Sequence, residues 1–235
     1  MAERATLLKE ISKNSESVFI LDAGNSISSI QVPSTKLLEL YESLDYDAYF
    51  ITAYEYRKLV KFFASEIENS PILFSSFTLL NKDGKQMFKP YIERTVNDEN
   101  ILFISLTGHT NIPSYYEDMH LMDKETAKKG LKELAGQYDG VFLITDFPRI
   151  EYELFEMGVK NIRFAFHLDL LHEKGRAKIN DAGGVSMLLP SDGKFFWHIG
   201  FLKSPEEQEA EQRFTLFDVR DGLEKDKNLI RLMEK

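Results

Sequence analysis

His167 and Asp169 are the residues whose types and spacing come closest to a metal site. They follow the apolar run Ile162–Phe166, which is typical of a strand, and their i, i+2 spacing places both on one side of an extended chain. Asp146 directly follows a predicted strand, and Asn25 lies in the turn after another. Ligands and catalytic groups collect at the carboxyl ends of strands in α/β sheets, so these positions are where a site is expected.

Each of these residues also has a purely structural interpretation. His167 and Asp169 could form a hydrogen-bonded pair, and Asp146 could cap a helix or lie in a loop, since Pro148 follows it closely. Asn25 after Gly24 is typical of a turn that adopts positive φ. The remaining histidines have no partner at metal-ligand spacing, and we expect them to be surface or packing residues: His109, His120, His172 and His198.

The composition restricts the class of protein. The chain has 235 residues, 43% of them hydrophobic, and a formal net charge of −9, which argues against a nucleic-acid partner. It has no Cys, which excludes thiolate zinc sites and a Cys nucleophile. No apolar run approaches the length of a membrane span, and the first residues lack a signal peptide's apolar core. As it stands, the sequence is that of a soluble, cytoplasmic chain, but it does not identify the compartment.

Hydrophobic periodicity predicts strands that alternate with helices up to residue 166, and hairpins after it. This order indicates an α/β or α+β domain with a mixed, helix-covered sheet. We expect a long loop at 107–122 and an antiparallel hairpin formed by 185–189 and 195–202. The predicted helices are 5–12, 36–44, 55–68, 123–136, 150–157 and 226–233, and the other predicted strands are 18–21, 47–52, 71–76, 87–93, 101–106, 141–145, 162–166 and 214–219.

Several segments, in order, resemble the N-terminal metallophosphoesterase domain of the 5′-nucleotidase family, which belongs to the calcineurin-like phosphoesterases. Arg4–Glu10 is similar to a helix of that family, and Ile20–Asn25 is similar to its strand and turn Leu-Leu-Asp-Ala-Gly-Asp. Tyr46–Ala48 matches its Tyr-Asp-Ala. Pro71–Ser76 and Lys82–Tyr91 resemble its Pro-Ile-Leu-Ser-Ala-Asn and Asp-Gly-Lys … Phe-Lys-Pro-Tyr segments, the latter being the most specific match.

The resemblance implies a metallophosphoesterase-like four-layer sandwich, in which helices flank two mixed β-sheets. Its first strand, which carries an Asp-x-His motif, has no counterpart here, because the sequence begins at the helix that follows that strand. We expect the domain to occupy 1–203 and a linker, a strand and a terminal helix to occupy 204–235. The family's C-terminal substrate domain has no counterpart in this sequence.

The resemblance also implies where the family's metal and catalytic residues would fall. The bridging Asp corresponds to Asn25, the Asn ligand to Ala53 and the adjacent catalytic His to Tyr54. The isolated His corresponds to Asp146, and Gly-His-x-His corresponds to Phe166–Asp169. Several ligands of a two-metal centre are therefore replaced, and Ala53 has no side-chain donor atom at all.

The leading hypothesis is a catalytically inactive 5′-nucleotidase-like domain that serves as a binding or scaffold module without a cofactor. The alternative is a phosphoester hydrolase, or a truncated form of one, with a rewired single-metal site for Mn, Zn or Mg. Its ligands would be Asn25, Asp146, His167 and Asp169. A third possibility is a subunit that pairs through an open sheet edge with a protein partner or with a second copy.

Overall fold

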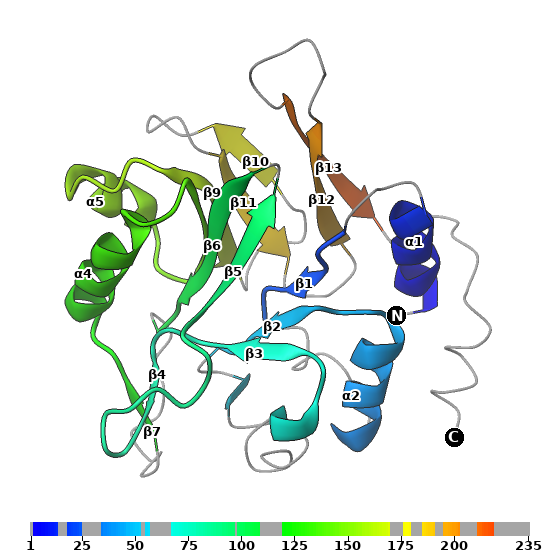
Figure 1. Ribbon diagram of the computed structural model, residues 1–235, viewed down its shortest axis with the longest axis horizontal. Coiled ribbons are helices and arrows are strands. Elements are labelled where there is room, and N and C mark those ends of the chain that lie inside the picture. The colour runs from blue at the N-terminus through cyan, green and yellow to red at the C-terminus, as the bar shows by residue number, and fades with distance from the viewer. Residues whose placement is uncertain are drawn as a thin grey trace.

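The computed structural model of the chain is shown in Figure 1. It describes residues 2–13, 18–24, 34–52, 55–56, 67–96, 98–108, 119–169, 176–179, 185–190, 195–202 and 211–218, and from residue 169 onward it describes the backbone alone. The predicted helix 226–233 and most of the predicted helix 55–68 lie outside these residues.

The largest sheet has six strands in the order β10-β11-β9-β8-β6-β5. The four inner strands are parallel, and the edge strands β5 and β10 are antiparallel to their neighbours. The predicted hairpin of 185–189 with 195–202 is wrong, because the first strand pairs with β9 and β10, and the second with β13. The strands are β5 (Tyr91–Val96), β6 (Glu99–Leu106), β8 (Gly140–Thr145), β9 (Ile162–Asp169), β10 (Arg176–Ile179) and β11 (Val185–Pro190).

Three smaller sheets complete the described strands. A parallel sheet contains β1 (Leu21–Asp22), β2 (Ala48–Phe50) and β3 (Leu73–Ser75), in that order. An antiparallel pair joins β4 (Leu79–Asn81) to β7 (Met119–Leu121), so part of the predicted loop 107–122 is a strand. A second antiparallel pair joins β12 (Phe195–Leu202) to β13 (Glu211–Asp218).

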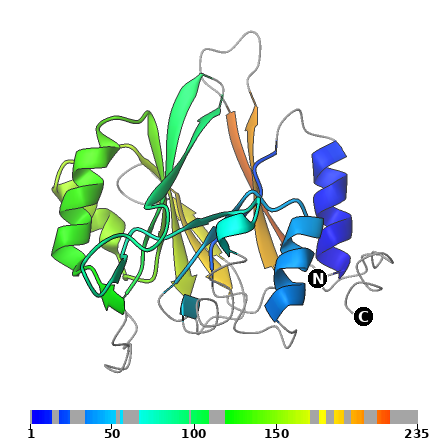
Figure 2. The ribbon, with the colours of Figure 1, turned by 60° about the horizontal axis from the view of Figure 1, so that its bottom comes forward.

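Helices cover the outer sides of the two larger sheets. Figures 1 and 2 show α4 (Lys124–Ala135) and α5 (Ile150–Glu156) beside the six-stranded sheet. On the other side of the molecule, α1 (Ala2–Lys13) and α2 (Ser34–Ser43) lie near the three-stranded sheet. The predicted N-cap of α4 is confirmed, since the Asp123 side chain accepts a hydrogen bond from the Thr126 N–H.

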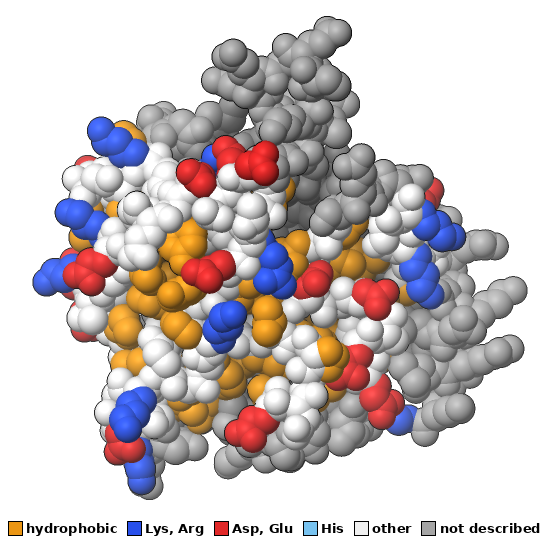
Figure 3. All heavy atoms as spheres, viewed as in Figure 1, with side chains coloured by type: hydrophobic (Ala, Val, Ile, Leu, Met, Phe, Trp, Pro, Cys, Tyr) orange, Lys and Arg blue, Asp and Glu red, His pale blue; other side chains and the backbone are white. Residues whose placement is uncertain are grey.

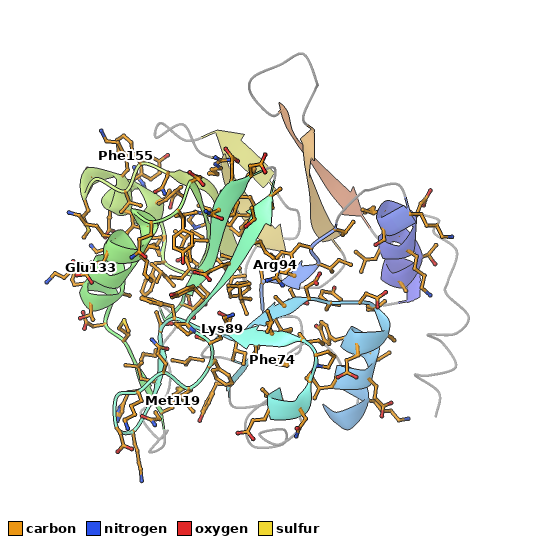
Figure 4. The ribbon with its side chains drawn as sticks, viewed as in Figure 1. Phe74, Lys89, Arg94, Met119, Glu133 and Phe155 are labelled. Carbon is orange, nitrogen blue, oxygen red and sulfur yellow. The ribbon has the colours of Figure 1, made fainter. Side chains whose placement is uncertain are left out.

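Three apolar clusters give the order of the layers. One cluster joins α1 and α2 to β2 and β3, and includes Phe74 (Figure 4). A second joins α4 and α5 to β6 and β8. The third lies between the two sheets and is rich in aromatic rings, with Phe142 in contact with Phe103, Phe164 and Phe166. Helices therefore pack on both sheets, which confirms the predicted mixed α/β fold.

Charged side chains are mixed on the surface. On the face shown in Figure 3, basic and acidic side chains of the described residues are interspersed, and apolar side chains gather near the middle. Phe155 is the exposed large hydrophobic side chain of the described residues, and it points outward from α5 (Figure 4).

Asn161 joins the end of α4 to the start of β9, and its loss should destabilise this part of the fold. Its amide donates to the carbonyl oxygens of Ala135 and Tyr138 at 2.9 and 2.8 Å. Because Asn161→Ala leaves both carbonyls without this donor, we expect the free energy of unfolding to fall by about 1–3 kcal/mol in urea titrations. The control is Gln137→Ala, an exposed residue with a long 3.5 Å contact to the Glu133 carbonyl. Equal stability of the two variants would contradict the prediction.

Candidate functional site

The carboxyl ends of three parallel strands lie side by side at one edge of the six-stranded sheet. The register pairs Leu106 of β6 with Thr145 of β8, and Thr145 with His167 of β9. Gly108 and Asp146 follow these strands along the same edge. Asp146 and His167 therefore follow adjacent strands at the same edge of the sheet.

Asp146 binds the backbone of the neighbouring strand end. Its two carboxylate oxygens accept the Gly108 N–H at 2.8 and 3.0 Å, which ties the end of β8 to the end of β6. Asp146 does not cap α5, because the N-cap of that helix is Arg149, with φ of 57°. Of the two structural interpretations given by the sequence, the loop acid is the correct one.

His167 lies on the helix-covered side of the sheet. Along β9, Phe164 and Phe166 belong to the cluster between the sheets, whereas Ala165 belongs to the cluster under α4 and α5. Side chains alternate along a strand, so His167 shares the side of Ala165. There its Nε2 atom lies 3.2 Å from a carboxylate oxygen of Glu151 on α5, and the two side chains are 14% and 5% exposed.

Glu151 is a site residue that sequence reasoning missed. It lies on the buried face of α5 with Ile150 and Leu154. An acidic side chain next to an apolar helical stripe is a signal that could have drawn attention to it, because a buried carboxylate needs a partner. The partner, His167, could not be read from the sequence, since it comes from a different element.

The other predicted site residues fall where the structure gives no side-chain contacts. Asn25, Ala53 and Tyr54 lie outside the described residues, and Asp169 is described by its backbone in β9. The residues next to Asn25, Ala53 and Tyr54 are described, however, and they belong to a buried polar network behind the ends of β1 and β2.

Glu55 is the centre of one half of this network. It is fully buried and accepts hydrogen bonds from the Tyr49 hydroxyl at 2.5 Å and from the Thr52 hydroxyl at 3.1 Å. The Thr52 N–H points at the same carboxylate, at 3.4 Å. Burial, and next the adjacent Glu55 charge, raise the pKa of Tyr49 well above its ordinary value. Tyr49 therefore remains a hydrogen-bond donor to Glu55.

Asp22 forms the other half of the network. One of its carboxylate oxygens accepts the Tyr41 hydroxyl at 3.0 Å, and the other accepts the Gly24 N–H at 2.9 Å. Gly24 has φ of +94°, and a Cβ atom built there would lie 2.5 Å from the Phe50 carbonyl oxygen. Only glycine fits this turn, which brings the end of β1 against the end of β2.

Comparisons with known proteins identify the fold. No protein-family model matches the chain, and no curated protein matches it. A putative 5′-nucleotidase from Staphylococcus aureus matches with a TM-score of 0.78 and 11% identity, over 100% of this chain and 52% of that one. A 5′-nucleotidase precursor from Thermus thermophilus matches with a TM-score of 0.70 and 15% identity, over 99% of this chain and 52% of that one. A calcineurin-like phosphoesterase from Bacillus subtilis matches with a TM-score of 0.68 and 13% identity, over 100% of this chain and 87% of that one.

The chain has the calcineurin-like phosphoesterase fold. This confirms the fold implied by the sequence resemblance to the 5′-nucleotidase domain. The chain spans about half the length of the nucleotidase structures that it matches.

A phosphoesterase fold raises the question of whether the residues present fit a divalent metal. Asp146 is bound to the Gly108 N–H, and His167 is paired with Glu151 on the helix-covered side. Each of the two side chains therefore has a protein partner in another element. Within the described ranges, no group of three or more His, Cys, Asp or Glu side chains is placed to hold a metal ion. The assignment of Asn25 and Asp169 as ligands stays a prediction.

The Tyr49 hydroxyl should stabilise the folded protein by holding the Glu55 carboxylate. Because Tyr49→Phe leaves this buried carboxylate with one donor fewer, we expect a loss of about 1–3 kcal/mol in the free energy of unfolding at pH 7. Tyr152→Phe is the control, since its ring is only half-buried and contacts Arg149 through its face. A Tyr49→Phe variant as stable as this control would contradict the prediction.

Alkaline pH should destabilise the protein through the same tyrosine. The unfolded chain loses the Tyr49 proton near pH 10, whereas the folded protein keeps it because the folded pKa is raised. The unfolded state then binds fewer protons, so stability falls as the pH rises above about 10. Tyr49→Phe should flatten this part of the stability-versus-pH curve. A curve with the same slope in the variant would show that Tyr49 does not cause the loss.

Proposed function

We propose that this chain is a catalytically inactive domain with the 5′-nucleotidase-like phosphoesterase fold, and that it acts as a binding or scaffold module. The observation that carries the proposal is the position of His167. Its imidazole is paired with Glu151 on the helix-covered side of the sheet, where it links β9 to α5. This contact supports a structural role for His167 in packing α5 on the sheet.

The replaced positions support the same proposal. By the sequence resemblance, Ala53 stands where the family has an Asn ligand, and Tyr54 stands where it has a catalytic His. Removal of even an outer-shell partner typically weakens metal binding about 10–100-fold, so the loss of several direct ligands should remove it. Asp146, which corresponds to another ligand position, accepts two contacts from the Gly108 N–H.

A second candidate function is a metal-dependent phosphoester hydrolase with a rewired single-metal site. The observation in its favour is that Asp146 and His167 follow adjacent strands at one sheet edge, the edge at which open α/β sheets bind ligands. Asn25 and Asp169 would supply the remaining ligands for Mn, Zn or Mg. Structures that share the fold are named nucleotidases and phosphoesterases, which makes this candidate worth testing directly.

Metal titration and hydrolysis assays separate the two candidates. The metal-stripped protein is titrated with Mn²⁺ by calorimetry, and hydrolysis of p-nitrophenyl phosphate and AMP is measured with Mn²⁺, Zn²⁺ or Mg²⁺. We expect no heat above dilution and no hydrolysis above the rate without protein. Saturable heat together with hydrolysis, both lost in Asp146→Asn and His167→Gln, would establish the hydrolase instead.

The His167–Glu151 pair should stabilise the fold without any metal. We expect His167→Gln and Glu151→Gln each to lower the stability, with an interaction energy of about 0.5–3 kcal/mol in a double-mutant cycle. The thermal midpoint of the unmodified protein should be the same in EDTA and in Mn²⁺. A midpoint that Mn²⁺ raises in the unmodified protein, but not in His167→Gln, would identify His167 as a metal ligand.

A further inference from the structure

We draw no further inference here: the strongest candidate, the group of fully buried serine hydroxyls of Ser75, Ser76 and Ser105 at the carboxyl ends of β3 and β6, belongs to the strand ends already described, and nothing in the described part of the chain shows what would bind there.

Discussion

Two buried carboxylates, Asp22 and Glu55, constrain how the three-stranded sheet is built. A carboxylate in an apolar interior is strongly unfavourable unless hydrogen bonds satisfy it. Tyr41 of α2 donates to Asp22, and Tyr49 of β2 donates to Glu55. The helix, both strands and the turn at Gly24 must therefore take these positions together. The two tyrosine rings also pack edge to face at 5.4 Å, so the polar network and the apolar cluster around it share side chains.

The carboxyl ends of β6, β8 and β9 in the six-stranded sheet are held by protein contacts of a different kind. Asp146 ties β8 to β6 through the Gly108 N–H, and His167 ties β9 to α5 through Glu151. Each contact joins two elements that a bound metal could otherwise join. Protein contacts of this kind can hold strand ends in place without a bound ion, so similarity of fold, at 11–15% identity, gives no activity by itself.

Most of the strands could be predicted because they are buried on both faces and so read as continuous apolar runs, as in 141–145. The pairing of those strands could not be predicted so well. The apolar runs 185–189 and 195–202 predicted a hairpin, but β11 pairs with β9 and β10, and β12 pairs with β13. The three-residue strand β7 is too short to show a periodic pattern. At the site, Asp146 and His167 follow adjacent parallel strands, whereas their contacts with Gly108 and Glu151 join different elements and could not be derived from the local sequence.

The two edge strands of the six-stranded sheet, β5 and β10, differ in length and in surroundings. The edge strand β5 is covered on one side, because the Arg94 guanidinium lies 4.5 Å over the Phe19 ring and Phe19 packs edge to face on Phe103. The other edge of that sheet, β10, is only four residues long. Short or covered edges are the usual protection against pairing with another chain. Both features limit pairing of the six-stranded sheet with another chain.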